Sequence, residues 1–145
     1  MPGMTSGVQY PLGKAGVVEL LQRYGIMPTQ QRIDIAHFLF QQPQHLSAEA
    51  ILDGVNTRRE RVSKATVYNT LGLFVRKGLV REVLIDPERV FYDSNTRPHH
   101  HIYNLDTGEL SDVQAGSVRV QELPVLPQGT EVDSLDVVIR VRNVR

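Results

Sequence analysis

The stretch that decides the fold is Ser63–Asp93, which reads SKATVYNTLGLFVRKGLVREVLIDPERVFYD. Ser63 is a good helix N-cap, and apolar residues follow it at helical spacing until Gly78. Two runs rich in β-branched and aromatic residues, 79–85 and 89–93, then flank an Asp-Pro-Glu turn, which indicates a hairpin. A capped helix followed by a hairpin predicts a winged helix, with this helix sized for the major groove of DNA.

The helix that follows Ser63 also predicts the DNA contacts. Its apolar stripe leaves a polar face whose side chains can reach phosphates, base edges and thymine methyl groups. The segment Arg58–Arg81 has seven basic residues against Glu60 alone, which is typical of a nucleic-acid footprint, although a solvated helix face gives the same pattern. The predicted DNA-contacting residues are Arg61, Lys64, Thr66, Tyr68, Asn69 and Arg76.

Three further helices are expected before this one. The first covers residues 14–24, the second begins after the N-cap Thr29, and the third runs from Ala48, after the N-cap Ser47, to about Asn56. We therefore expect residues 1–88 to form a winged-helix DNA-binding domain.

Composition narrows the class of protein. The 145 residues are 41% apolar with zero net charge, but residues 1–86 carry ten basic and seven acidic groups (+3) and residues 87–145 carry six and nine (−3). The chain has no cysteine, which excludes disulfides, thiolate zinc sites and a cysteine nucleophile. The N-terminus does not resemble a signal peptide, and no stretch is long and apolar enough to span a membrane. We expect a cytoplasmic protein without membrane contacts.

The segment Asp93–Asp112 holds three consecutive histidines, residues 99–101. In a strand, His99 and His101 share one face and His100 points to the other. A two-residue hairpin loop at 107–108 places Asp112 opposite Tyr103, diagonal to His101 and on its face; a loop one residue longer sends it to the other face.

Residues 89–145 are expected to form a second domain. Two short strands surround residues 107–108, and Leu135–Val141 predicts a third. A small three-stranded sheet rarely stands alone, so we expect it to bury its face against a second copy. A homodimer would present two recognition helices to a palindromic site.

Several separated motifs resemble the ferric uptake regulator family over nearly the whole chain. They are Gly25, Thr29-Gln30-Gln31-Arg32, His45-Leu46-Ser47-Ala48-Glu49, Ala65-Thr66-Val67-Tyr68, Gly78-Leu79-Val80 and His99-x-His101. The resemblance implies a dimeric bacterial transcriptional regulator, a repressor that binds palindromic double-stranded operator DNA according to metal status. It also implies the α+β fold class, with an N-terminal winged helix-turn-helix domain and a small C-terminal α/β dimerisation and metal-sensing domain.

The resemblance also supplies a regulatory metal site, which falls on His45, Asp93, His99, His101 and Asp112. Three imidazoles and two carboxylates without sulfur suit iron(II) or manganese(II) best, with zinc an alternative in purified protein. The bland alternative is that two of these histidines are ordinary surface residues. His37 matches no ligand position and is interpreted as structural.

The chain departs from the family pattern in ways that bear on the signal. The family's Cys-x-x-Cys falls on Asn104 and Thr107, so no structural four-cysteine zinc site is expected. Arginine is common in relatives at Asn69, and a basic residue at Met27, so the usual operator cannot be assumed.

The sequence resembles two branches of the family, which imply different signals. Asp112 resembles the peroxide-sensing (PerR) branch, in which iron(II) would promote oxidation of His45 or His99. The triple histidine and other segments look most like the cysteine-poor iron-response (Irr) branch, which implies haem on His99, His100 or His101. A small metalloenzyme is the remaining alternative, but no nucleophile or acid–base pair accompanies the cluster; we therefore predict no enzyme activity.

Overall fold

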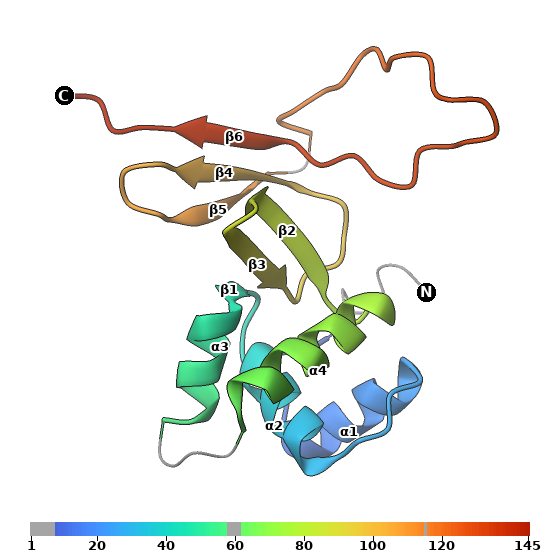
Figure 1. Ribbon diagram of the computed structural model, residues 1–145, viewed down its shortest axis with the longest axis vertical. Coiled ribbons are helices and arrows are strands. Elements are labelled where there is room, and N and C mark those ends of the chain that lie inside the picture. The colour runs from blue at the N-terminus through green and yellow to red at the C-terminus, as the bar shows by residue number, and fades with distance from the viewer. Residues whose placement is uncertain (1–7, 58–61, 115) are drawn as a thin grey trace. The chain divides into compact units, whose positions relative to one another are not determined.

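The computed structural model describes residues 8–57, 62–114 and 116–145. The chain forms two compact units, Met1–Arg97 and Pro98–Arg145 (Figure 1). The division falls after Arg97, whereas the sequence suggested residue 88. The reason is that strand β3 (Arg89–Asp93) pairs antiparallel with both β1 (His45–Ser47) and β2 (Arg81–Asp86), so all three strands belong to the first unit.

The second, third and fourth helices of the first unit begin directly after the N-caps that the sequence predicts. Thr29, Ser47 and Ser63 each accept a hydrogen bond from a backbone N–H three residues ahead, at 3.4, 3.1 and 3.1 Å. These bonds satisfy donors that a helix leaves unpaired in its first turn. The helices are α1 (Lys14–Arg23), α2 (Gln30–Leu39), α3 (Ala48–Val55) and α4 (Lys64–Arg76).

Helix α4 packs on its apolar stripe and stops at a glycine. Val67, Leu71 and Phe74 are fully buried, as predicted, in the core that all four helices share. Gly78 has a φ of +79°, a conformation that costs a residue with a Cβ more than it costs glycine. The turn lets Leu79 N–H donate to the Phe74 carbonyl at 2.9 Å, so the chain leaves α4 directly into the β2–β3 hairpin.

The α+β fold class predicted from the sequence is confirmed, and the winged-helix arrangement of helices followed by a hairpin is visible in Figure 1. Strand β1 was not predicted. Three residues are too few to show an alternating pattern, and Ser47 reads as a helix cap. Among the described residues, no helix is both long and apolar enough to cross a bilayer.

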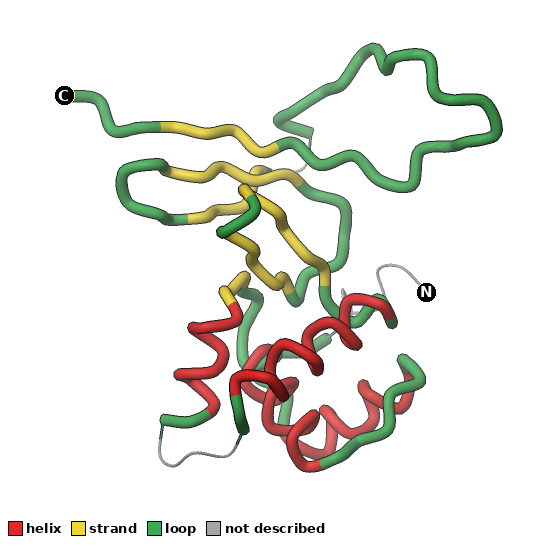
Figure 2. Tube along the Cα trace, in the orientation of Figure 1, coloured by secondary structure: helices red, strands yellow, loops and turns green. Residues whose placement is uncertain are grey.

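The second unit contains a three-stranded sheet in the order β5-β4-β6. Strand β4 (His100–Asn104) pairs antiparallel with β5 (Leu110–Val113) and parallel with β6 (Val138–Val141). The last strand is shorter than the predicted Leu135–Val141, and the described residues between β5 and β6 form a long loop (Figure 2). Among the described residues of the second unit, the buried apolar side chains are those of Tyr103, Leu110 and Val113. Many others in residues 120–144 stay exposed.

Candidate metal centre and nucleic-acid interface

The register of the β4–β5 hairpin determines which candidate metal-ligating side chains lie opposite one another. His101 lies directly opposite Asp112, and Tyr103 lies opposite Leu110, so the predicted diagonal placement of Asp112 was wrong. The loop covers residues 105–108, two more at its start than expected. The cause is Asn104, whose side-chain oxygen accepts hydrogen bonds from the N–H groups of Asp106 and Thr107 at 2.8 and 3.1 Å. Since two extra residues preserve parity, Asp112 still shares the face of His101.

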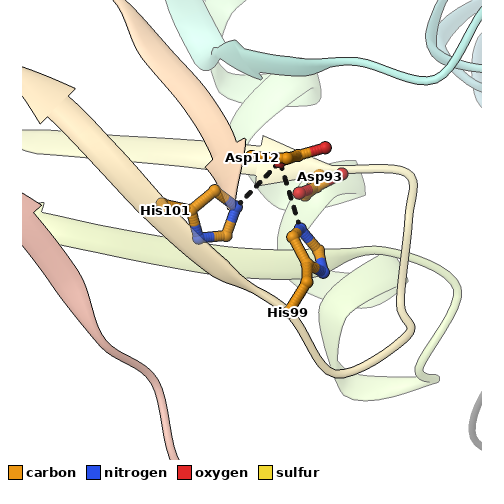
Figure 3. A group of neighbouring side chains, drawn as sticks. All are labelled: Asp93, His99, His101 and Asp112. Atoms are coloured by element: carbon orange, nitrogen blue, oxygen red, sulfur yellow. Dashed lines mark ion pairs between the residues drawn. The ribbon is translucent and has the colours of Figure 1, made fainter. Parts of the chain in front are cut away.

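Two histidines converge on one carboxylate oxygen. Nε2 of His99 lies 3.3 Å and Nε2 of His101 lies 3.4 Å from Oδ1 of Asp112 (Figure 3). The imidazole centroids are 4.5 Å apart. His101 is 1% exposed and His99 is 9% exposed, whereas the Asp112 side chain is 50% exposed. Two buried nitrogen donors therefore meet a carboxylate that remains open to solvent.

This donor set fits a divalent cation. Ligand atoms about 2.0–2.2 Å from an ion lie roughly 3.0 Å apart at a right angle and roughly 3.4 Å apart at the tetrahedral angle. The two observed nitrogen–oxygen distances, 3.3 and 3.4 Å, fall near that range. Imidazole and carboxylate without thiolate suit iron(II), manganese(II) and zinc.

The remaining two predicted ligands lie in the first unit. His45 and Asp93 are direct partners in the β1–β3 pairing, so their Cβ atoms leave the same face of the sheet roughly 4.5–5.5 Å apart. Asp93 is 1% exposed, and its Oδ1 accepts a hydrogen bond from the Asn95 N–H at 2.8 Å. The His45 ring lies edge-on to Phe91, with centroids 6.4 Å apart. The five predicted ligands thus form a pair in the first unit and a trio in the second.

His100 does not join the trio. Its Nδ1 accepts a hydrogen bond from the Val137 N–H at 3.1 Å, which ties β4 to the residue before β6. The haem expectation for residues 99–101 gains no support, because His99 and His101 both engage Asp112 and His100 has a structural bond. His37 is half-buried on α2.

The polar face of α4 is exposed as predicted. Lys64, Tyr68, Asn69 and Arg76 are exposed. Thr66 is half-buried, and its hydroxyl accepts a hydrogen bond from the Ser63 hydroxyl at 2.9 Å, so it also serves the helix cap. Arg61, the sixth predicted contact, lies outside the described residues.

Two features of this face were not predicted. Tyr68 donates a hydrogen bond to Oε1 of Glu49 at 2.5 Å. An open cleft of about 330 Å³ also separates the start of α2 from α4. The residues lining it are Thr29, Gln31, Arg32, Thr66, Asn69 and Thr70. In the sequence, the sign of this cleft was the N-cap Thr29 followed three residues later by Arg32. The sequence does not show that these two residues lie beside α4, which only the fold reveals.

The chain is similar to known proteins in sequence and in structure. Residues 23–140 match the model of the Ferric uptake regulator family. The peroxide-responsive repressor PerR of Staphylococcus aureus is 32% identical over 94 residues, 65% of this chain and 64% of the relative. The corresponding PerR of Staphylococcus epidermidis is 30% identical over 92 residues, 63% of this chain and 61% of that protein. The chain thus spans less than two thirds of these relatives.

Solved structures agree on the fold. The ferric uptake regulator of Pseudomonas aeruginosa with manganese has a TM-score of 0.67 at 26% identity, covering 88% of this chain and 97% of that one. The regulator of Vibrio cholerae has a TM-score of 0.66 at 22% identity, over 87% and 98% of the two chains. These relatives are named as repressors and regulators, so the metalloenzyme alternative is set aside. Because the family model matches most of its length, this chain belongs to the ferric uptake regulator family.

Proposed function

We propose that this protein is a dimeric, metal-responsive transcriptional regulator that binds palindromic double-stranded operator DNA. The observation that carries the proposal is the convergence of His99 and His101 on one oxygen of Asp112, in a chain that also presents a capped, basic helix. A metal site alone fits an enzyme and a basic helix alone fits any DNA-binding protein. Their combination is what a metal-dependent regulator needs.

We assign the resident metal to iron(II) or manganese(II), with zinc as a competitor. The trio supplies two nitrogens and one oxygen, and we propose that His45 and Asp93 complete the set. Five ligands of this kind suit iron or manganese better than a closed tetrahedral zinc site. The related Pseudomonas aeruginosa protein was solved with manganese, which supports this assignment.

In this proposal, metal binding changes the conformation of the first unit because His45 and Asp93, which lie in that unit, become ligands. A ligand shifts a conformational equilibrium only by the difference between its affinities for the two states. Moving a population from 1:99 to 99:1 takes about 5.5 kcal/mol, which is within reach when two ligands are gained. The metal would then favour one arrangement of the recognition helices over another.

DNA binding is assigned to the exposed face of α4. Lys64 and Arg76 are placed to pair with phosphates, and Tyr68 and Asn69 to meet base edges. The cleft lined by Arg32 and Asn69 adds a polar surface that can bind the DNA backbone. Such a protein would work in the cytoplasm, where its operator lies.

The homodimer is assigned to residues 98–145. Large apolar side chains in this unit stay exposed, including Leu123 at 50%, Leu135 at 42% and Ile139 at 39%. Strand β6 lies at the edge of the described sheet, beside β4, and an edge strand is a ready site for pairing with another chain. A second copy would cover both features, and it would set two copies of α4 at a fixed spacing.

Peroxide is our preferred refinement of the signal. The related staphylococcal proteins are peroxide-responsive repressors, and this chain has no thiol that peroxide could oxidise. In the proposed reaction, one oxygen of hydrogen peroxide enters a ring C–H bond of His45 or His99, and the other leaves as water. Bound iron(II) would promote this step, and bound manganese(II) would not.

Peptide mass tests this refinement. Protein loaded with iron(II) without oxygen is exposed to mild peroxide, digested and weighed, with a manganese(II) sample as the control. We expect one added oxygen on the His45 or the His99 peptide in the iron sample alone. Unmodified peptides in both samples would leave iron status, rather than peroxide, as the signal.

A further inference from the structure

A hydrogen bond joins the recognition helix to the helix before it. Tyr68, on the second turn of α4, donates to Oε1 of Glu49, on the first turn of α3, at 2.5 Å. Nζ of Lys64 lies 5.9 Å from the centroid of the Tyr68 ring, within range of a cation–π interaction. We name these three residues the Tyr68 triad. Tyr68 is 40% exposed, yet both its hydroxyl and its ring have partners.

The charges of the triad reinforce one another. The hydrogen bond from Tyr68 lowers the pKa of Glu49, and the ammonium of Lys64 lowers it further. The same bond raises the pKa of the Tyr68 hydroxyl. At neutral pH Glu49 is therefore a carboxylate and Tyr68 a neutral donor. Charge-assisted bonds of this kind are shorter and stronger than neutral ones.

A carboxylate at this position is costly for a surface that meets phosphates. Glu49 is exposed, and it is directed at the residue predicted to read bases. Its charge weakens binding to any DNA, whatever the sequence, because each phosphate repels it. A gain in sequence discrimination would offset that loss.

We propose that Glu49 is a positioning residue that fixes Tyr68 for base recognition, an inference that rests on the proposed DNA-binding function. With its proton committed to Glu49, the Tyr68 hydroxyl offers DNA only its acceptor lone pairs, and the ring offers an apolar face. Such a group suits the amino hydrogens of adenine or cytosine and the methyl of thymine, and it is a poor partner for phosphate. The bond also removes rotamer freedom that Tyr68 would otherwise lose on binding.

The test measures discrimination and not affinity alone. A duplex is selected from a random-sequence library by the full-length wild-type protein, with and without manganese(II). The ratio of its affinity to that of a shuffled duplex is then measured at fixed salt for the wild type, Glu49→Ala and Glu49→Gln. Glutamine keeps a carbonyl acceptor for Tyr68 but removes the charge, so it is the matched control.

We expect Glu49→Ala to lower the affinity ratio by about two- to tenfold, the range for freeing one ordered side chain. Glu49→Gln should keep the ratio within about twofold of the wild type, while binding both duplexes more tightly because a negative charge is gone. An unchanged ratio in Glu49→Ala overturns the proposal. An equal loss in both variants also overturns it, because charge and not orientation would then be responsible.

A titration without DNA separates this inference from the function on which it rests. The Tyr68 hydroxyl is followed by NMR, with Tyr68→Phe identifying its signal. In Glu49→Ala the pKa of Tyr68 should fall toward its ordinary value, and an unmoved pKa would refute the bond. If the wild type selects no duplex, the DNA-binding function itself fails. If it selects one and Glu49→Ala discriminates equally well, only the role of Glu49 fails.

Discussion

His45 and Asp93 are direct cross-strand partners in the pairing of β1 with β3. This relationship ties a proposed ligand pair to the helices that we propose bind DNA, because His45 lies two residues before Ser47, the N-cap of α3. The preceding residue, Gln44, donates from its side-chain amide to the Phe38 and Leu39 carbonyls at 3.0 and 3.1 Å, at the end of α2. A shift of β1 would therefore move the ends of two helices.

The metal trio makes a direct prediction about affinity. Asp112→Ala removes the carboxylate that both His99 and His101 approach, so manganese(II) affinity should fall by more than about 100-fold, the upper cost of losing only a supporting group around a metal. Isothermal titration of the full chain measures this. His100→Ala is the control, since His100 faces away, and it should keep the wild-type affinity. Equal affinities for Asp112→Ala and the wild type would remove the trio from the site.

Tyr68 should contribute sequence discrimination. Tyr68→Ala removes the proposed base contact, so the preference for a selected duplex over a shuffled one should fall by about 1–3 kcal/mol. Manganese(II) affinity and oligomeric state should not change, because Tyr68 lies on the exposed face of α4. Fluorescence anisotropy with both duplexes gives the values. Wild-type discrimination in this variant would mean that α4 is not the recognition helix.

The N-cap of α4 predicts a stability change. Ser63 Oγ accepts a hydrogen bond from the Thr66 N–H at 3.1 Å, and Ser63→Ala should lower the free energy of unfolding by about 1 kcal/mol. Ser63→Gly is the matched control and should cost only a few tenths of that. Urea denaturation, followed through the unfolding of the first unit, gives the free energy of unfolding of each variant. Equal losses in the two variants would show that the cap bond is not what stabilises the helix start.

The exposed edge strand predicts a dimer that one charge can disrupt. Ile139 is 39% exposed on β6, and Ile139→Asp should convert the dimer to a monomer in sedimentation experiments. Val144→Asp places the same charge on a side chain that is 97% exposed beyond the strand, and it should leave the dimer intact. A monomeric wild type, or a dimeric Ile139→Asp, would contradict the assignment.

Local signals in the sequence explain how much could be predicted. Thr29, Ser47 and Ser63 mark helix starts by side-chain chemistry that acts over three residues, so the helices and their order were predictable. That His101 and Asp112 share one face of the sheet was predictable, because side chains alternate between the two faces and an error of two residues in the loop does not change the face. The loop itself was missed, because the side chain of Asn104 closes the turn early.

Relationships between distant residues could not be read in the same way. Strand β1 exists only because β3 lies beside it, 44 or more positions along the chain. The Tyr68–Glu49 bond joins residues 19 positions apart on two helices, and an exposed glutamate has many alternative partners. The proposed ligand roles of His45 and Asp93 came from family resemblance, since the spacing of the two residues carries no ligand signal.

The central claim is that metal at the His99, His101 and Asp112 site controls DNA binding. The most direct measurement is the affinity of the full chain for a selected duplex, titrated with manganese(II) in the wild type and in His101→Ala. We predict at least a tenfold change in the wild type, in either direction, and none in His101→Ala, while that variant keeps its fold by circular dichroism. A wild type that ignores manganese(II) and iron(II), or a His101→Ala variant that still responds to them, would contradict the account.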